Sequence, residues 1–559
     1  MSKTQHAPQA TVDWRNLDAG TTIPTPGMKY CDQPYPVRLP DDTWLCMLTV
    51  GTLGENAQGT QNYTAVTISR DEGQTWSAFA PCNAPSYAVP LVTPYGRIYA
   101  LTPSCFTYSD DLGKTWSNPC TIPAYPEEWS GWSVGMPLVH GSLAFLPWAR
   151  ISLPNPPRRT EVYFHRSHNL LTERDPEKVH WRRLPGAGNG LRGPDWAKPE
   201  HRSEEPHIVA LTDGTLYTVF RTDQGYIGYA TSRDSGDTWS TPKPLSYHPD
   251  GGRVIKHPLA CPSLWDCGQG RYLLFFHNHS GTTYADRNPA WISGGLEVDG
   301  EIKWSEPEIL LYSDDLTYDS GRISYPGLLQ RNNRYWIFET QKTLTRLHEI
   351  PGTLFEGTWQ PESEARITTD GLVLSLAAAS GIPAETPSPA LPPFRKPWSN
   401  EDQRQGFSLD LWLNPGASAV TQRLLDNRTH TGRGFCLQLT GDGGLELILN
   451  DGQTENRWTC GPGLLGSDRP QHVAVIVDGG PKVITCVING QLWDGGSDHQ
   501  HGWGRFSPNL KTVDGGSTLR IAPDAGSLPA MSAVKVYSRA LSTSEAVANF
   551  RAEWKERTR

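Results

Sequence analysis

The sequence predicts an all-β chain in which a six-bladed β-propeller is followed by a smaller β-sandwich. An eight-residue phrase occurs three times, as SRDEGQTW at 69–76, SDDLGKTW at 109–116 and SRDSGDTW at 232–239. The chain contains 54 Gly, 47 Pro and 21 Trp but only 5 Met, a composition typical of short strands joined by tight turns. Its 559 residues exceed the size of one ordinary domain, so at least two are expected.

Each copy of the phrase predicts a β-hairpin turn. Its Asp can accept hydrogen bonds from the turn backbone, its Gly supplies a positive φ, and its closing Thr-Trp is expected to begin a strand with a buried indole. The first two copies start 40 residues apart and the next follows after 123, close to three periods of 41, with a weaker copy, YSDD, at Ser313. A period near 40 residues predicts four-stranded propeller blades, about six of them over 27–375.

Composition places the remaining boundaries. Residues 1–26 are expected to form an N-terminal extension. The proline-rich stretch GIPAETPSPALPPFRKPW predicts a semi-rigid connector over 376–400, because this proline density disfavours regular strands and helices. The sandwich is then expected over 401–559.

The predicted sandwich shows alternating apolar and polar residues, which is typical of strands. The pattern is clearest at 406–415, 472–479 and 482–490. Near the C-terminus, one strand and a short helix are expected, the helix capped by Ser542 with Glu545 three residues later.

Charge and cysteine usage exclude several partners. A formal net charge of −9 without a long basic run argues against nucleic acid binding. The first residues have no apolar core typical of a secretory signal, and no run is long enough to span a bilayer, so a soluble protein is expected, cytoplasmic unless a leader has been removed.

The ten cysteines lack zinc-site spacing, so buried free thiols are preferred, with disulfides left open. No cofactor and no metal are expected.

The three phrases resemble the Asp-box of sialidases, and the C-terminal region resembles laminin-G or concanavalin-type lectin sandwiches. In that superfamily the Asp-box turns lie on the face away from the active site. The resemblance therefore implies a structural role for the repeated aspartates, Asp71, Asp111 and Asp234.

Sialidase chemistry requires specific residue types. The substrate sugar carries a carboxylate on its anomeric carbon, so arginine forks must bind it, and a carboxylate nucleophile would be repelled. Sialidases use a tyrosine activated by a base instead. The segment EEPHIVALTDGTLYTVFR resembles the one carrying the glutamate partner and a binding arginine, which places Glu205 and Arg221 in these roles. SGRISYPGLL resembles the segment of the nucleophile, which places Tyr325 there.

The sialidase pattern is incomplete at its beginning. Its opening Arg-Ile-Pro is replaced by CDQPYPVRL, which puts Asp32 and Gln33 at the expected position of the arginine. The following loop, 51–63, contains Glu55 but no Asp for the acid.

A second resemblance covers more of the chain. The phrases CDQPYPVRLPDDTWLC, HNHSG, RNPAWISGG, IKWSEPEILLY and SYPGLL…YWIFETQKT are similar to glycoside hydrolase family 181, sialidases that act on sialylated mucin-type O-glycans. The resemblance implies an essential Asp and Gln 22 positions apart, matched here by Asp319 and Gln341. Asp319 could protonate the leaving oxygen and Gln341 could hold a water or an oxyanion. Tyr325 with Glu205 or Glu339 would then activate the nucleophile.

Further candidates are weighed against plain structural roles. Arg287 and Arg322 are candidate substrate-binding forks, but each could equally form an ordinary salt bridge. Tyr325 could be a core phenol and Asp319 a turn residue. His277 and His279 alternate with Asn278, so on a strand both would point to one face; they are expected to bind sugar hydroxyls or to pack, rather than to hold a metal.

Three functions remain open from the sequence. The preferred hypothesis is an exo-α-sialidase that releases terminal sialic acid from sialoglycans, mucin-type O-glycans included. The second is a propeller glycosidase or lyase acting on another acidic sugar, which would explain the missing arginine. The third is a non-catalytic glycan-binding protein.

Overall fold

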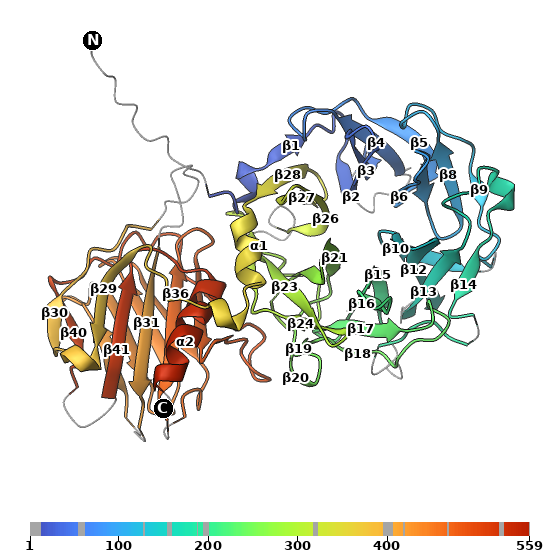
Figure 1. Cartoon of the computed structure of the whole chain (residues 1–559). Helices are drawn as coiled ribbons and strands as arrows, with labels where there is room; N and C mark the ends of the chain where they lie inside the picture. Colours follow the sequence, from blue (N-terminus) through green and yellow to red (C-terminus); the bar gives the residue numbers. More distant parts are fainter. Residues whose placement is uncertain are drawn as a thin grey trace, which may run out of the picture. The chain divides into compact units, whose positions relative to one another are not determined.

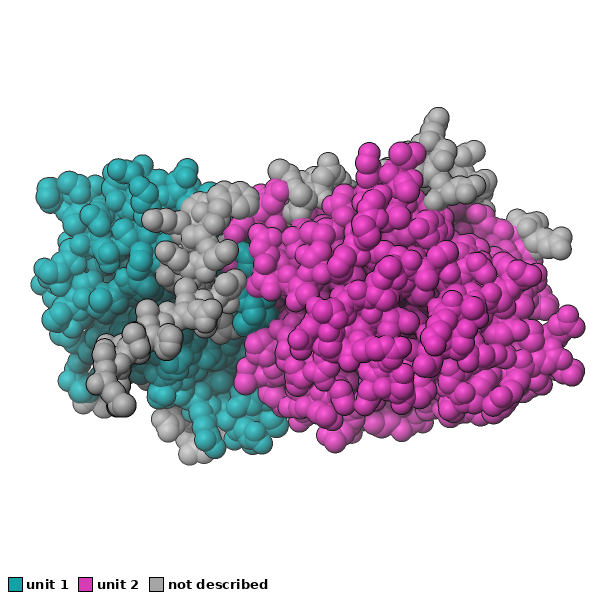
Figure 2. Space-filling view, turned by 90° about the horizontal axis from the view of Figure 1, so that it is seen from above, with its two compact units in different colours: residues 1–16, 306–308, 360–559 teal, residues 17–305, 309–359 magenta. Residues whose placement is uncertain are grey.

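The computed structural model describes residues 13–53, 62–126, 129–153, 159–186, 188–193, 201–316, 322–394, 406–416, 420–466, 469–524 and 530–557. They form two compact units, drawn in magenta and teal in Figure 2. The first is the propeller, residues 17–305 and 309–359. The second is the sandwich, residues 1–16, 306–308 and 360–559. The prediction of an all-β chain with these two folds is confirmed.

The described part of the propeller contains six antiparallel sheets of four or five strands, arranged around a centre (Figure 1). The first two sheets are β2 (Tyr30–Arg38), β3 (Trp44–Gly51), β4 (Tyr63–Ser69) and β5 (Ala80–Pro85), then β6 (Val89–Val92), β7 (Ile98–Leu101), β8 (Cys105–Ser109) and β9 (Cys120–Thr121). The third is β10 (Ser130–Val134), β11 (Leu138–His140), β12 (Leu143–Leu153), β13 (Arg159–Ser167) and β14 (Arg182–Leu184).

The other three sheets follow the same order. The fourth is β15 (Ser203–Ala210), β16 (Leu216–Thr222), β17 (Ile227–Ser232) and β18 (Lys243–Pro244). A hairpin, β19 (Ser246–His248) and β20 (Gly251–Val254), precedes the fifth, β21 (Ser263–Gly268), β22 (Arg271–Phe276), β23 (Ala290–Val298), β24 (Glu301–Trp304) and β25 (Glu308–Leu311). The sixth is β26 (Ser324–Arg331), β27 (Arg334–Thr340), β28 (Thr345–Ile350) and β1 (Thr21–Ile23). A short helix, α1 (Gly352–Thr358), follows it.

The first strand of each sheet lies nearest the centre (Figure 1). These inner strands contact one another around the ring, β2 with β6 and β26, and β15 with β10 and β21. The N-terminal strand β1 completes the last sheet by pairing with β28, so distant parts of the chain close the ring. Residues expected as an N-terminal extension are therefore part of the propeller.

The three Asp-box turns have the same hydrogen bonds. In the first, Asp71 accepts from the Thr75 backbone N–H at 2.8 Å and from its hydroxyl at 2.5 Å, while Ser69 Oγ accepts from Gly73 N–H at 2.8 Å. The Trp76 indole N–H closes the turn by donating to the Gly73 carbonyl at 3.1 Å. Equivalent bonds occur at 109–116 and 232–239. Both Asp oxygens are thus used inside the turn.

Two expectations about these turns were wrong. The closing tryptophan is only half buried and lies in the loop, because the next strand begins four residues later at Ala80 in the first copy. The interval between the second and third copies spans two sheets rather than three, because only one sheet lies between the sheets that carry them. The third sheet and its connection to the fourth account for the extra length, because β10 begins at Ser130 and β15 only at Ser203.

The sandwich consists of two packed sheets. One is β29 (Leu372–Ala377), β41 (Ala530–Tyr537), β31 (Gly406–Asn414), β36 (Gln471–Asp478), β37 (Val483–Ile488), β38 (Gln491–Leu492) and β39 (Gly504–Arg505). The other is β30 (Glu385–Pro387), β40 (Thr518–Ile521), β32 (Gln422–Asp426), β33 (Gly434–Leu439), β34 (Leu445–Asn450) and β35 (Glu455–Cys460). Their inward-facing leucines, valines and phenylalanines form one core.

The boundary of the sandwich differs from the prediction. Strand β29 pairs with β41, and β30, inside the expected connector, pairs with β40. Proline does not prevent this, because β30 lies at the edge of its sheet, where a missing N–H costs nothing. The N-terminal segment also joins this unit, since Arg15 forms buried ion pairs with Asp13 at 2.8 Å and Asp478 at 2.6 Å.

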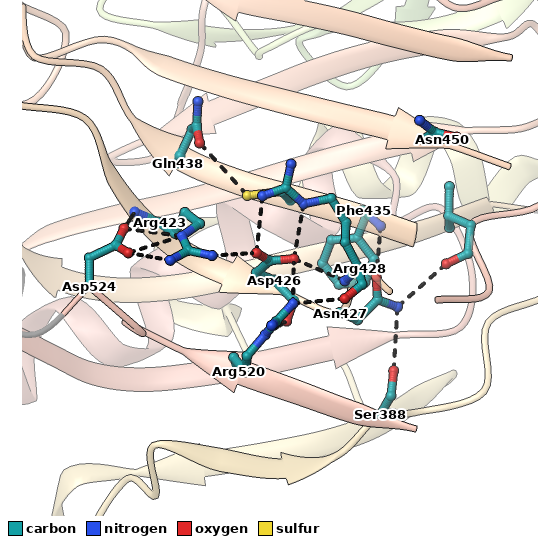
Figure 3. A network of polar contacts seen from close by, with 12 residues as sticks. Ser388, Arg423, Asp426, Asn427, Arg428, Phe435, Gln438, Asn450, Arg520 and Asp524 are labelled. Atoms are coloured by element: carbon teal, nitrogen blue, oxygen red, sulfur yellow. Dashed lines mark hydrogen bonds and ion pairs between the residues drawn. The ribbon is translucent and has the colours of Figure 1, made fainter. Parts of the chain in front are cut away.

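Two polar arrangements stabilise the sandwich. Helix α2 (Thr543–Arg557) begins with the predicted capping box, in which Ser542 Oγ accepts from Glu545 N–H at 3.3 Å and Ser542 N–H donates to Glu545 at 2.8 Å. On the second sheet, three arginines surround the buried carboxylate of Asp426 (Figure 3). These are Arg423, Arg428 and Arg520.

All ten cysteines are free thiols, seven of them buried, in agreement with the preferred prediction. In the part of the chain that the structure describes, no helix has the length and apolarity needed to cross a membrane.

Candidate active site

Three inner strands of the propeller contain the same kind of β-bulge. In β2, β15 and β26, a residue with positive φ precedes a proline, and the strand pairing shifts register there. These residues are Gln33 (φ 53°), Glu205 (φ 51°) and Tyr325 (φ 46°). Left-handed backbone costs a non-glycine residue about 1–3 kcal/mol and is concentrated at functional sites. Each bulge redirects one side chain, and all three belong to the predicted site.

Tyr325, Glu205 and Arg221 form one buried cluster. The Tyr325 hydroxyl donates to Glu205 Oε1 at 2.6 Å, across 120 positions of sequence. Arg221 Nη1 donates to both Glu205 oxygens at 2.9 Å. The structure therefore brings together the predicted nucleophile, its glutamate partner and a predicted binding arginine.

Burial and charge set the protonation states of the cluster. Burial opposes ionisation of Glu205, but Arg221, the Tyr325 hydroxyl and Arg287 outweigh it and hold the pKa of Glu205 below its usual value. Burial raises the pKa of Tyr325 well above that of free tyrosine, and the Glu205 charge adds to this, while Arg221 and Arg287 oppose it. At neutral pH the pair is thus a phenol that donates to a carboxylate, which is the state a base-activated nucleophile requires.

Arg287 lies beside this cluster. Its Nη1 donates to Ser324 Oγ at 3.0 Å, next to Tyr325, and its Nη2 donates to the Leu259 carbonyl at 3.0 Å. Arg221 contacts Glu205 directly, and the charge of Arg287 also helps to lower the pKa of Glu205. Such a pair can hold a further anion that enters the centre.

Tyr284 and Arg202 belong to the same region and were missed in the sequence. The Tyr284 ring centroid lies 5.0 Å from the Arg221 guanidinium carbon, 5.7 Å from that of Arg202 and 5.8 Å from that of Arg287. Its hydroxyl accepts from Arg202 at 2.6 Å. Tyr284 is 39 % exposed, so it covers the arginine cluster on the side that faces the solvent.

Asp32 and Gln33 are buried on β2. Asp32 accepts from the Tyr30 hydroxyl at 2.7 Å and forms a buried ion pair with Lys342, whose ammonium lies 4.4 Å from the Tyr325 ring centroid. Gln33 Oε1 accepts from the Tyr35 hydroxyl at 3.2 Å. Asp32 is linked to the Tyr325 cluster through Lys342, which no sequence pattern singled out.

His277 and His279 are buried beyond the end of β22. His279 contacts the Asp286 carbonyl through Nε2 at 2.8 Å and accepts from Gly281 N–H at 3.2 Å. Burial lowers the pKa of His277 well below its usual value, and nearby His257 and Arg287 contribute. A neutral His277, and a His279 that is bonded to the loop before Arg287, fit a packing role, and neither lies within the strand β22. In the described residues, no group of three or more His, Cys, Asp or Glu side chains could hold a metal ion.

The remaining candidates are placed less directly. Asp319 lies outside the described residues. Gln341 is buried, and its side-chain oxygen accepts from Arg346 on β28. Glu339 is buried nearby, with His348 Nε2 at 3.6 Å and Arg346 at 3.8 Å from its carboxylate. Arg322 is half buried just before β26.

The sequence contains a shared signal for the three bulges but none for the missed residues. The three bulges share an acidic or polar residue, or a tyrosine, immediately before proline in an apolar strand, as in DQP, EEP and SYP. This recurrence would have marked the inner strands together. Lys342, Arg202 and Tyr284 had no such mark, because their positions depend on loops folding back toward the centre.

Comparison with known families identifies two domains. Residues 96–337 match the BNR repeat-like domain, and residues 396–547 match the concanavalin A-like lectin/glucanases superfamily. No curated protein matches the chain.

Solved structures that match the chain include several sialidases. The sialidase of Trypanosoma rangeli in complex with 2,3-difluorosialic acid is 13% identical over 98% of this chain and 99% of that chain, with a TM-score of 0.42. A mutant of NanB sialidase from Streptococcus pneumoniae is 14% identical over 59% of this chain and 70% of that chain, with a TM-score of 0.43. A protein of unknown function from Dyadobacter fermentans is 17% identical over 59% and 98%, with a TM-score of 0.42.

Similarity at this level does not establish an activity, and the resemblance to glycoside hydrolase family 181 stays a prediction. The two domain matches agree with the propeller and the sandwich of the fold. The chain therefore joins a BNR repeat-like domain to a concanavalin A-like domain.

Proposed function

We propose that the chain is an exo-α-sialidase that releases terminal sialic acid from sialoglycans. The observation that carries the proposal is the buried contact of 2.6 Å between Tyr325 and Glu205, with Arg221 on the same carboxylate. A glycosidase acting on a sugar with an anomeric carboxylate needs a nucleophile without charge, a base to take its proton and cations for the substrate acid. These three requirements are met by neighbouring side chains of the centre.

The proposed reaction has two steps. The Tyr325 oxygen attacks the anomeric carbon, its proton passes to Glu205, and the bond to the leaving oxygen breaks as that oxygen takes a proton from an acid. Asp319 stays the predicted acid. A water then attacks the anomeric carbon and gives a proton to the carboxylate left on the acid, while the bond to Tyr325 breaks and Glu205 returns its proton to the phenolate. Two displacements retain the anomeric configuration.

Arg221 and Arg287 are proposed to bind the substrate carboxylate. Both are more than nine-tenths buried, so their charges are weakly screened and strongly favour an anion. Arg287 is held by Ser324 and by a backbone carbonyl, so it does not depend on Glu205 for its position. Tyr284 would cover the substrate from the solvent side.

The first experiment measures free sialic acid released from sialyllactose and from a sialylated O-glycan. Wild type should release it from at least one, and Tyr325→Phe should lose at least about 10²-fold in kcat, because the attacking oxygen is gone. Gln341→Ala reports on the competing assignment of Gln341 as an essential residue. Tyr537→Phe in the sandwich is the matched control, since it also removes a buried hydroxyl that is hydrogen bonded, at 3.0 Å to Thr368 O.

The same assay separates the alternatives. An unsaturated uronic acid product would indicate a lyase, and glycan binding without any product would indicate a binding protein. Proton NMR of the first product formed tests the mechanism, because inversion at the anomeric carbon would exclude a Tyr325-linked intermediate.

A further inference from the structure

Lys342 occupies an unusual position at the centre of the propeller. It lies in the turn between β27 and β28, has a φ of 73° and is buried. Its ammonium pairs with Asp32 on β2 and lies 4.4 Å from the centroid of the Tyr325 ring on β26. A lysine is rarely buried unless it is paired, and Asp32 supplies the partner here; the position over the tyrosine ring is what requires an explanation.

The side chain is not needed to hold the turn in place. The Lys342 carbonyl accepts from Cys31 N–H at 2.8 Å, and the Thr340 hydroxyl donates to the Cys31 carbonyl at 2.7 Å. Thr340 Oγ1 also accepts from the Lys342 N–H at 2.9 Å. These bonds fasten the turn to β2 through backbone and threonine groups, so the position of the turn does not depend on the ammonium.

The position over the ring suggests a role for the ammonium. A cation within about 6 Å of an aromatic ring is attracted by its negative face, and the attraction grows when the ring carries a full negative charge. Burial disfavours the phenolate of Tyr325, and Glu205 repels it, so the centre needs cations for the nucleophile to form. Arg221 lies on the Glu205 side of the hydroxyl, and Lys342 lies over the ring.

We propose that Lys342 is a positioning residue that stabilises the Tyr325 phenolate from the face of the ring, with Asp32 holding the ammonium in place. The role of this phenolate in catalysis rests on the proposed function. The electrostatic link between Lys342 and Tyr325 does not, because it can be measured without a substrate.

The test replaces Tyr325 with 3,5-difluorotyrosine, whose phenol ionises at lower pH, and follows its ionisation by fluorine NMR. Lys342→Met should raise the pKa of this phenol by about one unit, a tenfold change in its dissociation constant, because a cation over the ring is lost. Asp32→Asn should lower it, because a nearby negative charge is lost while the amide oxygen of Asn can still accept a hydrogen bond from the ammonium. A role of the ion pair in packing alone would not move the two values in opposite directions.

Control variants keep the test decisive. Lys535→Met removes a buried ammonium of the sandwich, paired with Glu553 at 2.8 Å, and should leave the phenol unchanged. Lys342→Gln keeps a donor for Asp32 and serves if Lys342→Met does not fold. An unchanged or lower pKa in both Lys342 variants would overturn the proposal, whatever the protein does with sialoglycans. Absence of sialic acid release together with the expected pKa changes would overturn the proposed function alone.

Discussion

Two structural features each occur three times in the described part of the propeller, the Asp-box turn and the bulge of an inner strand. The turns share their side chains, whereas the bulges share only their backbone conformation. The Asp-box turns, at 69–76, 109–116 and 232–239, share Ser, Asp, Gly, Thr and Trp at matching positions and have the same hydrogen bonds. The central bulges have the same backbone, a positive φ before proline, but three different side chains, Gln33, Glu205 and Tyr325. The turns use their polar atoms internally, whereas the Glu205 and Tyr325 side chains of two bulges contact each other from different sheets.

This difference separates stability from chemistry. A turn whose polar groups hydrogen bond with one another needs the same side chains in every copy, so its sequence repeats. A central site needs complementary groups, a donor, an acceptor and cations, so its positions diverge while the backbone stays constant. The same propeller can therefore support its fold with the repeated residues and its chemistry with the variable ones.

The largest expected effect comes from the glutamate at the centre. Glu205→Gln should lower kcat for sialic acid release by about 10²–10⁴-fold, because the amide cannot take the Tyr325 proton. The rate is measured on protein whose far-ultraviolet circular dichroism matches wild type. A rate within tenfold of wild type would mean that the central bulges do not carry the chemistry.

The pH dependence should respond to Arg221. Arg221 helps to keep the pKa of Glu205 low, so the acid limb of kcat/KM should lie below the usual glutamate value of about 4.3. With Arg221→Met the pKa of Glu205 should rise, and the acid limb should move to higher pH by about one unit or more. Arg97→Met, which removes an arginine paired with Asp110 at 2.7 Å, is the control and should not move it.

Asp-box variants should behave in the opposite way. Asp111→Ala should lower Tm by a few degrees, because it removes acceptors for the Thr115 N–H at 2.9 Å and hydroxyl at 2.6 Å. The kcat of the folded protein should stay within twofold of wild type. Calorimetry and rate measurements on one sample check both, and a lost rate with an unchanged Tm would contradict the division of roles.

The smallest effect is the acid sensitivity of the turns. Hydrogen bonds from Thr238 lower the pKa of Asp234 to about 2. A lowered pKa in the folded state contributes stability that is present above the unfolded value of about 3.9 and is lost as pH falls toward about 2. Asp234→Asn should therefore flatten the change of Tm between about pH 4 and pH 3 slightly, which paired calorimetric scans can detect.

The features that could be predicted from the sequence are those determined locally. The Asp-box phrases, the strands around 406–415 and 472–479, and the Ser542 capping box were predicted because each is determined by residues close in sequence. The spacing between the second and third phrases was misjudged, because insertions change the length of a blade without changing its turn.

Within the site, resemblance of local motifs was enough to name Tyr325, Glu205 and Arg221, but not to show that they touch. Tyr325 and Glu205 are 120 positions apart and meet only because the ring closes. Lys342 and Tyr284 come from loops whose sequences have no distinctive pattern. The turns, the strands and the presence of two domains follow from the sequence alone, because they depend on local hydrogen bonds and alternating burial. Which charges share the centre becomes visible only in the folded chain, because it depends on the closure of the ring and on the bulges of the inner strands.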